Sequence, residues 1–378
     1  MRDLRRLPGW AAVLLAAGCA VAKQPAPAAE SSGQEALSRG DAAAIIADLR
    51  WIDTTEGIAD LRQIEVGGIT QWISIRGKHR DNPILLFVHG GPGSPMMPAS
   101  WVFQTPWEEY FTVVQWDQRG AGKTAAANDP AVVTPTIDLE RMVADGEEVV
   151  QYLRDAFGQP KVFLLGHSWG TFIGLEIARR HPEWLHAYVG MGQAVNAPAN
   201  ERTGYEFALA EARRRGDRAA LAELEGIAPY PAPDGSVTVE QIITQRKWVI
   251  AYGGLTWGRD DYGYEQNAVR LSPDYDARDL AALRRAGLGS LNQLIGAMNA
   301  VRYDETALDF RCPIVIFAGR YDYETVSDVA RAWFDRITAP SKRFVWFEHS
   351  AHMIPFEEPG KLLLHLVQDV RPLARSGE

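Results

Sequence analysis

The sequence predicts an α/β fold, a mainly parallel sheet with helices on both faces and an inserted helical cap. Short, continuous apolar runs alternate with segments of helical periodicity, which is typical of strands that are buried on both faces. Between about residues 195 and 308 this alternation stops, and helix-like segments follow one another. The chain has 378 residues, 46% of them hydrophobic, which is enough for one large domain with such an insertion.

The first 22 residues have the composition of an export signal. Three arginines precede an apolar run that is too short to span a bilayer as a mature helix. Residues 15–19 (LAAGC) resemble a bacterial lipobox, in which Cys19 would be lipidated, whereas residues 20–22 (AVA) offer an ordinary cleavage site. Residues 23–40 would then be a flexible linker. We expect an exported protein, either a periplasmic or cell-envelope lipoprotein that meets the membrane only through Cys19, or a secreted protein.

The core is expected in two segments, residues 41–194 and 309–378, which flank the cap at residues 195–308. The clearest buried strands are residues 83–88 (PILLFV) and 313–318 (PIVIFA), which are continuous apolar runs. Apolar residues at helical spacing predict a long helix from about residue 139 to residue 157. The other predicted strands are residues 111–116, 161–165, 187–191 and 343–347, and the helix-like cap segments are residues 205–215, 239–250 and 280–300.

A candidate nucleophile follows the predicted strand at residues 161–165. Residues 166–170 read GHSWG and precede an apolar helical run, which is the strand–turn–helix context of a G-x-S-x-G nucleophile elbow. Small residues at both ends of so sharp a turn avoid clashes and leave the hydroxyl of Ser168 exposed. A serine hydroxyl is a poor nucleophile until a base accepts its proton, so a base is needed nearby.

The base and the acid that orients it should come later in the chain, in the order serine, acid, histidine. Asp322 and His352 each lie in a loop that follows a predicted strand. Because we expect these strands to be neighbours, both side chains could converge on Ser168. Glu324 is an alternative acid, although it lies where the next helix begins, and His349 is an alternative base that follows its strand closely.

Backbone N–H groups that could stabilise an oxyanion are expected at two places. Residues 89–93 (HGGPG) follow the predicted strand at residues 83–88, and glycines there let backbone N–H groups approach a substrate closely. Pro92 has no N–H to donate. The predicted donors are therefore the N–H groups of Gly91 and of Trp169, the residue after the nucleophile.

Composition and motifs argue against several other functions. The formal net charge of −9 leaves no basic excess for a nucleic-acid partner. Residues 120–124 (GAGKT) resemble the end of a phosphate-binding loop, but Asp117 stands where the full motif requires glycine. The eight histidines form no cluster with metal-ligand spacing, so we do not expect a metal site. Cys312 is expected to be a small core residue and not a reactive thiol.

Together these motifs resemble the proline iminopeptidase branch of the α/β-hydrolase superfamily, over about residues 60–375. The resemblance implies a serine hydrolase that acts through an acyl-enzyme and releases an N-terminal residue, often proline, from small peptides without a metal or cofactor. The H-x-x-x-x-E-x-P pattern selects His352 over His349, because counting from His349 would miss Glu357 and Pro359. The motifs are HGGPG at 89–93, DQRGAG at 117–122, GHSWG at 166–170, GRYD at 319–322 and H-x-x-x-x-E-x-P at 352–359.

In the cap the resemblance is incomplete. Iminopeptidases of this branch hold the free amino group of the substrate with cap glutamates, one of them in a Trp-Glu-Gly-Glu-like stretch that this sequence lacks. The cap glutamates present here are expected to be solvated on helix faces, and its aromatic residues line either a pocket or the core of the cap. An esterase, lactonase or amidase with the same triad, acting on uncharged acyl groups, is therefore the alternative function. The residues concerned are Glu201, Glu206, Glu240, Glu265, Trp248, Tyr252 and Trp257.

Overall fold

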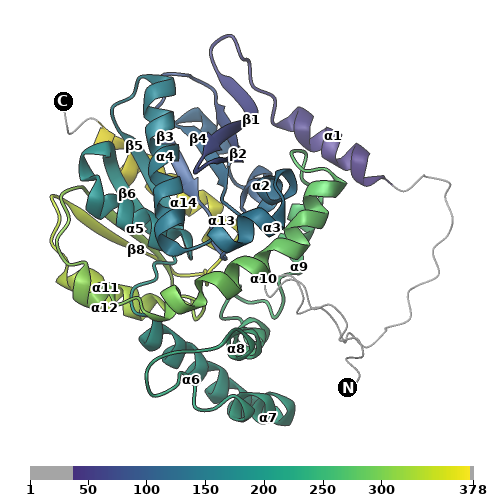
Figure 1. The fold of residues 1–378 in the computed structure, drawn as a ribbon, viewed down its shortest axis with the longest axis vertical. Coiled ribbons are helices and arrows are strands. Elements are labelled where there is room, and N and C mark those ends of the chain that lie inside the picture. Colours follow the sequence, from purple (N-terminus) through teal and green to yellow (C-terminus); the bar gives the residue numbers. More distant parts are fainter. Residues whose placement is uncertain (1–36, 375–378) are drawn as a thin grey trace.

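The computed structural model describes residues 37–374, except the side chains of residues 284–286. The predicted signal peptide, Cys19 and most of the predicted linker lie outside the described residues. Eight strands form one sheet in the order β1-β2-β4-β3-β5-β6-β7-β8 (Figure 1). The neighbours from β4 to β8 are parallel, whereas β1 pairs with β2 and β2 with β4 in antiparallel fashion. The mainly parallel α/β-hydrolase sheet predicted from the sequence is confirmed.

All six predicted strands are present within two residues of their expected bounds. Five of them are almost entirely buried because helices cover both faces of the sheet, as the continuous apolar runs indicate. The sixth, at residues 342–347, lies at the edge of the sheet and begins with two exposed residues. The strands are β1 (Ile58–Val66), β2 (Ile69–Gly77), β3 (Ile84–Val88), β4 (Thr112–Asp117), β5 (Val162–His167), β6 (Leu185–Met191), β7 (Ile314–Gly319) and β8 (Lys342–Phe347).

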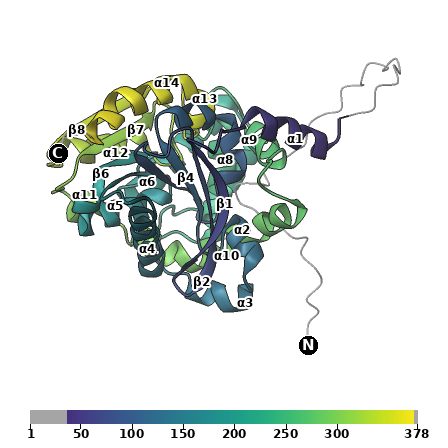
Figure 2. The same ribbon diagram turned by 90° about the horizontal axis from the view of Figure 1, so that it is seen from above.

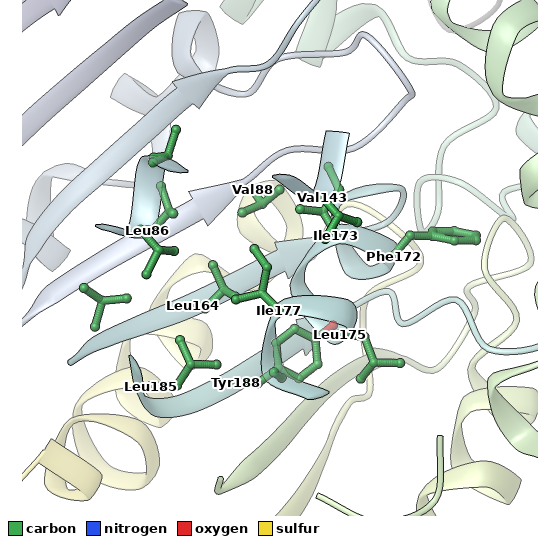
Figure 3. Packing of buried hydrophobic residues seen from close by; sticks show 14 of the residues in the cluster. Leu86, Val88, Val143, Leu164, Phe172, Ile173, Leu175, Ile177, Leu185 and Tyr188 are labelled. Atoms are coloured by element: carbon green, nitrogen blue, oxygen red, sulfur yellow. The ribbon is translucent and has the colours of Figure 1, made fainter. Parts of the chain in front are cut away.

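Strand β3 shows how the two layers of the core arise from one apolar run. Its side chains alternate between the faces of the sheet, and all five are buried. Leu86 and Val88 face the cluster that α4 and α5 complete, and Figure 3 shows them beside Val143 and Ile173 of those helices. Phe87 faces the opposite cluster, which contains residues of the C-terminal helices.

The helices of the core flank this sheet in both views (Figures 1 and 2). The long helix predicted from residue 139 to residue 157 is α4, which begins after the N-cap Asp138 and ends at Gly158 in the left-handed conformation. No helix among residues 37–374 is long and apolar enough to cross a bilayer. The core helices are α2 (Gly122–Ala127), α3 (Pro130–Val133), α4 (Leu139–Phe157), α5 (Gly170–Arg180), α12 (Ser327–Arg336), α13 (Ile354–Glu357) and α14 (Pro359–His365).

The chain between β6 and β7 forms the predicted helical cap. Helices α6, α7 and α8 lie together at one end of the molecule (Figure 1) and share a hydrophobic cluster that includes Tyr205, Leu224 and Val249. Helix α10, by contrast, runs back along the core and packs on α2. The cap helices are α6 (Ala197–Arg215), α7 (Arg218–Gly226), α8 (Val239–Ala251), α9 (Gly263–Arg270), α10 (Ala277–Asn299) and α11 (Tyr303–Thr306).

The N-terminal part of the described chain contains elements that the sequence did not predict. Strand β1 alternates buried and exposed side chains because it lies at the edge of the sheet, so it has no continuous apolar run. Helix α1 (Arg39–Leu49) begins two residues before the expected start of the core. The hydroxyl of Ser38 accepts the N–H of Asp41 at 3.1 Å, and the Asp41 carboxylate accepts the N–H of Ser38 in return.

Candidate active site

Ser168 lies in the turn between β5 and α5, as the elbow motif predicts. Its φ of 54° is in the left-handed region that residues other than glycine rarely adopt. The turn leaves no space for side chains at either glycine of the motif. A Cβ at Gly166 would lie 2.6 Å from the carbonyl oxygen of Gly170, and one at Gly170 would lie 2.0 Å from that of Val88. The two glycines therefore permit the turn that presents Ser168.

Asp322 and His352 come together at the ends of the neighbouring strands β7 and β8. The Nδ1 atom of His352 donates to Oδ2 of Asp322 at 2.8 Å, and both side chains are buried. The other carboxylate oxygen of Asp322 accepts the backbone N–H groups of Glu324 (2.9 Å) and Thr325 (2.8 Å). These bonds fix the carboxylate, which in turn fixes the imidazole with its Nε2 atom free of Asp322.

Ser168 and His352 line the same cavity. The hydroxyl of Ser168 donates no hydrogen bond to His352 within the described part of the chain. Such bonds are often long in free hydrolases and shorten when substrate binds. The side chain of Ser168 is 8% exposed, so its hydroxyl is reached from the cavity and not from bulk solvent.

The pKa of His352 is set by two opposing effects. Burial by itself would lower it, since a low-dielectric surrounding disfavours the imidazolium ion. The charge of Asp322 and the hydrogen bond to it outweigh burial and raise the pKa of His352 above 6.5. An imidazole with this environment accepts a proton readily and is stabilised once it is charged.

The two alternatives that the sequence left open lie elsewhere. His349 is exposed and packs against the ring of Trp257, with centroids 5.0 Å apart, outside the cavity. Glu324 accepts a hydrogen bond from Nε of Arg246 at 2.8 Å and does not contact Nδ1 of His352. Of the candidates considered, Asp322 and His352 are the pair that the structure brings together.

Thr325 is a contact of this pair that the sequence analysis missed. Its hydroxyl donates to Oδ2 of Asp322 at 3.0 Å and lies 3.1 Å from Nδ1 of His352. Its position in the sequence, three residues after Asp322, only weakly indicates this contact, because a threonine near the start of a helix usually caps that helix. Here it gives the buried carboxylate a further donor.

The predicted oxyanion donors both lie beside Ser168. Gly91 and Trp169 line the cavity region that also contains Ser168. Gly91 has a φ of 118°, which a residue with a Cβ would adopt only with strain. Within residues 37–374 neither backbone N–H donates to another residue, so both can donate to a substrate. A Cβ at the adjacent Gly90 would lie 2.9 Å from Cβ of Ser168, which explains the first glycine of the HGGPG motif.

Two further buried histidines near the site are held neutral. Burial lowers the pKa of His89 to about 4, and burial together with the neighbouring charge of His352 lowers the pKa of His167 to about 3. The ring of His167 lies 4.8 Å from that of His352, and its Nε2 atom is 3.1 Å from the backbone oxygen of His352. A neutral His167 therefore supports the loop of His352 without opposing its protonation.

Two of the four cap glutamates are buried, contrary to the expectation that all four are solvated. Glu206 and Glu240 are exposed as expected. Glu201 is buried because Arg246 binds it through two nitrogens, at 2.6 and 2.9 Å, and the charge of Arg246 lowers the pKa of Glu201 despite burial. Glu265 is 1% exposed, lines the cavity and accepts a hydrogen bond from Arg259 at 3.0 Å. The sequence could not show these pairings, because each partner comes from another turn or helix.

Trp248, Tyr252 and Trp257, the cap aromatic residues considered from the sequence, do not line the cavity. Trp248 and Tyr252 pack in the hydrophobic cluster of α6 to α8, and Trp257 is 41% exposed. The cap instead contributes Ile242, Arg246 and Tyr262, together with apolar residues of α10, to the cavity wall. The alternative that these aromatic residues belong to the core of the cap applies to Trp248 and Tyr252.

A short cap segment is hydrogen-bonded to both loops of the acid–base pair. The carbonyl oxygen of Gly254 accepts the N–H of Tyr323, and that of Leu255 accepts the N–H of His352, both at 3.0 Å. Glu357 joins the same parts, since its carboxylate accepts the N–H of Trp257 and, at 2.9 Å, the N–H of Ala351. Residues 254–257, which we name the cap strap, thus hold the loops after β7 and β8.

Clusters of metal-ligating side chains and the free thiol of Cys312 were also considered as candidate sites. Among residues 37–374, no three histidine, cysteine, aspartate or glutamate side chains gather in a way that could hold a metal ion. Cys312 is buried and free, and burial raises the pKa of its thiol to about 11, which agrees with its expected place in the core.

The chain is similar to known proteins in sequence and in fold. The family described as serine aminopeptidase, S33, matches residues 84–359. The Bacillus subtilis (strain 168) protein named "Probable aminopeptidase YbaC" is 27% identical over 315 residues, which cover 82% of this chain and 95% of that protein. A proline iminopeptidase of Lactobacillus delbrueckii subsp. bulgaricus is 24% identical over 319 residues, or 82% of this chain and 96% of the relative. The crystal structure of the Mycobacterium smegmatis proline iminopeptidase shares the fold, with a TM-score of 0.62 and 18% identity over 84% of this chain and 100% of that one.

Proposed function

Because the chain belongs to the serine aminopeptidase family S33, in the proline iminopeptidase-like branch of the α/β hydrolases, we propose that it releases N-terminal residues from small peptides through an acyl-enzyme on Ser168. In this proposal Ser168 is the nucleophile, His352 is the base and Asp322 orients the imidazole. The 2.8 Å bond between Asp322 and His352, at the ends of β7 and β8, and the cavity that His352 shares with Ser168 support these roles.

The proposed reaction uses these residues in two steps. His352 takes the proton of the Ser168 hydroxyl as its oxygen attacks the scissile carbonyl, and the imidazolium is stabilised by Asp322. The N–H groups of Gly91 and Trp169 donate to the oxyanion that forms. His352 then gives the proton to the leaving amine. Water, deprotonated by the same histidine, hydrolyses the ester and releases the N-terminal residue.

The observation that favours a peptidase over an esterase is an unpaired carboxylate oxygen in the cavity wall. Glu201 and Glu324 both bind Arg246, so this group of three charges has a net charge of −1. The Oε1 atom of Glu324 accepts from Arg246, but its Oε2 atom is buried without a partner among residues 37–374. A buried carboxylate oxygen is costly to leave unpaired, and a substrate ammonium group would satisfy it. Glu324 lines the cavity with Ser168 and His352, where the amino group of an N-terminal residue would lie.

The nucleophile is tested with a fluorophosphonate probe, which reacts with activated serines. We expect the probe to label Ser168 and expect Ser168→Ala to abolish both labelling and turnover, since loss of a triad member costs several powers of ten in rate. Mass spectrometry of the labelled peptide identifies the residue. Labelling at another serine, or an alanine variant that keeps most of its activity, would contradict the proposed mechanism.

The substrate class is tested with paired arylamides. The protein should cleave a prolyl or alanyl arylamide and reject the N-acetylated form, because acetylation removes the charge that a buried carboxylate would recognise. Short acyl esters serve as the comparison. Equal rates on free and acetylated arylamides, or a preference for uncharged esters, would favour the esterase, lactonase or amidase alternative and leave the serine mechanism intact.

A further inference from the structure

We infer that Gln118 is a positioning residue that holds the two proposed oxyanion donors, Gly91 and Trp169, in their relative places. The inference rests on the proposed function. Gln118 follows directly after β4, and its side chain is fully buried. The catalytic scheme above gives no role to this residue, although it belongs to the DQRGAG motif.

The amide group of Gln118 joins two segments that come from different strands. Its Nε2 atom donates to the carbonyl oxygen of His89 at 2.8 Å, and its Oε1 atom accepts the indole N–H of Trp169 at 3.0 Å. Its backbone N–H also donates to Nε2 of His89 at 3.3 Å. His89 follows β3 and Trp169 follows β5, and β4, β3 and β5 are consecutive in the sheet. One side chain therefore reaches across the end of β3 and connects the loop after β3 with the turn after β5 that carries Ser168.

The contacts of His89 extend this connection to Gly91. Its Nε2 atom accepts the N–H of Gln118, so its Nδ1 atom carries the hydrogen and donates to the carbonyl oxygen of Gly90 at 2.8 Å. Burial, which lowers the pKa of His89 to about 4, keeps this ring neutral and preserves the tautomer. The path from Gln118 to the peptide that carries the N–H of Gly91 is thus made of buried hydrogen bonds.

Such a connection matters because oxyanion donors act only within a narrow range of distance. Donors must lie about 2.7–3.1 Å from the place where the oxyanion forms, and the loss of one donor costs about 10²- to 10³-fold in kcat. The indole of Trp169 is stacked on Phe172, with centroids 5.2 Å apart, on α5. Gln118 provides the hydrogen bonds that connect the packed indole of Trp169 to the glycine-rich loop after β3.

A buried glutamine three residues earlier, inside β4, provides a matched control. Gln115 is as buried as Gln118, and its Nε2 atom donates to Gln104 at 2.9 Å, away from the cavity residues. Gln118→Met and Gln115→Met each replace a buried amide by an apolar side chain of similar size. Both variants leave former partners unpaired, so both are expected to lower the melting temperature.

The test measures kcat, KM and the affinity for a boronic acid analogue of the substrate, using the full chain. The boronate forms a reversible bond with the Ser168 oxygen and places a boron-bound oxygen at the oxyanion position. In Gln118→Met we expect kcat to fall about 10- to 100-fold with KM within about threefold, and the boronate affinity to fall by a similar factor. In Gln115→Met all three quantities should stay within about twofold.

If Gln118→Met folds poorly, a second variant and a double-mutant cycle still test the role of Gln118. Gln118→Glu retains the acceptor for Trp169 but sets a carboxyl oxygen against the carbonyl of His89, so the same kinetic losses are expected. Trp169→Phe removes the indole N–H and keeps the backbone N–H. If Gln118 acts through Trp169, the losses in the double variant with Gln118→Met should be clearly less than the product of the single losses.

Two outcomes separate the inference from the function on which it rests. If Gln118→Met and Gln118→Glu lower the melting temperature while kcat and boronate affinity match those of Gln115→Met, Gln118 is only a core residue and the inference is wrong. If Ser168→Ala retains the turnover of the wild type, the proposed function itself is wrong, and the inference is overturned with it.

Discussion

At the scale of single residues, the chemistry depends on how burial and charge act together on His352. Burial disfavours its imidazolium ion, and the charge of Asp322 favours it by more, so the pKa of His352 rises above its usual value. A base must be unprotonated in the free enzyme. Activity should therefore be lost as the pH falls through this raised pKa.

We predict that kcat/KM of the wild type has an acidic limb with an apparent pKa above 6.5, and that Asp322→Asn moves this limb to lower pH. The shift follows because an uncharged amide at this position would no longer raise the pKa of His352. The variant should also lose about 10⁴-fold in kcat through the wrong tautomer. pH–rate profiles of both proteins check this, with His349→Ala as a control that should resemble the wild type. A limb that stays at the same pH in Asp322→Asn would contradict the assignment of Asp322.

Glu324 carries the second prediction at this scale. Glu324→Gln keeps an acceptor for Nε of Arg246 but removes the negative charge that we propose binds the substrate ammonium group. We expect kcat/KM for a free aminoacyl arylamide to fall about 10- to 100-fold, in line with the strength of hydrogen bonds to charged groups, while fluorophosphonate labelling is unchanged. Glu206→Gln, an exposed change on α6, is the control. An equal loss of labelling and turnover would show that Glu324 supports Asp322 and does not bind the amine.

At the scale of elements, two glycines within helices lie in opposite environments, one against a buried ring and the other exposed. Gly174 in α5 faces the buried ring of Tyr188, and a Cβ there would lie 2.7 Å from its Cε2 atom. That ring cannot easily move, because its hydroxyl donates to Gln193 at 2.6 Å. Gly296 in α10 is exposed, and a Cβ there would meet nothing within 4 Å. Packing governs the first position, and helix propensity governs the second.

We therefore predict that Gly174→Ala lowers the free energy of unfolding by about 1–3 kcal/mol through overpacking. Gly296→Ala should raise it by about 0.5–1 kcal/mol, because alanine loses less entropy in a helix than glycine does. Chemical denaturation of the two variants beside the wild type measures both changes. A stabilised Gly174→Ala would mean that α5 can move away from β6.

The elements also show how far the sequence alone could lead. The strands that are buried on both faces were predicted well, because nearly every residue of such a strand is apolar, as in residues 83–88. Strand β1 could not be found in this way, since its contacts with β2 decide its structure and one of its faces is exposed. At the site, the G-x-S-x-G motif identified Ser168. The order of serine, acid and histidine, together with the H-x-x-x-x-E-x-P pattern, selected His352. The burial of Glu201 and Glu265 depends on arginines from other parts of the cap, which no local pattern reveals.

At the scale of the whole molecule, a buried polar group joins the cap to the core. Oδ2 of Asp117, at the end of β4, accepts the backbone N–H of Lys123 at 2.6 Å and the hydroxyl of Tyr275 from the cap. The ammonium group of Lys123 binds Asp279 of α10. Burial outweighs these contacts and raises the pKa of Asp117 from 3.8 to about 7. The folded protein thus keeps a proton that the unfolded chain releases near pH 4.

This proton links stability to pH. Because the folded state binds more protons than the unfolded state between about pH 4 and pH 7, the contribution of Asp117 to stability is lost as the pH rises through this range. Asp117→Asn can keep both accepted bonds, since both go to Oδ2 and Oδ1 has no partner in the described part of the chain. We predict a flatter dependence of melting temperature on pH in this variant, and a melting temperature at pH 8 no lower than that of the wild type.

The comparison needs a control, because burial also raises the pKa of Glu357 to about 7 and some pH dependence should remain. Asp155→Asn, an exposed change on α4, should give the pH dependence of the wild type. Melting curves between pH 5 and pH 8 for the wild type, Asp117→Asn and Asp155→Asn measure how the melting temperature of each depends on pH. Parallel profiles for Asp117→Asn and the wild type would show that Asp117 is ionised in the folded protein.

The cap strap has a consequence for exchanging caps between hydrolases. Residues 254–257 provide the acceptors for the N–H groups of Tyr323 and His352, so this part of the insertion belongs functionally to the two loops of the core. A chimera that replaced everything between β6 and β7 would leave both loops without these bonds. A graft that exchanged α6 to α8 but retained the strap would change the wall of the cavity and keep the acid–base pair supported. The natural unit for recombination is therefore smaller than the insertion itself.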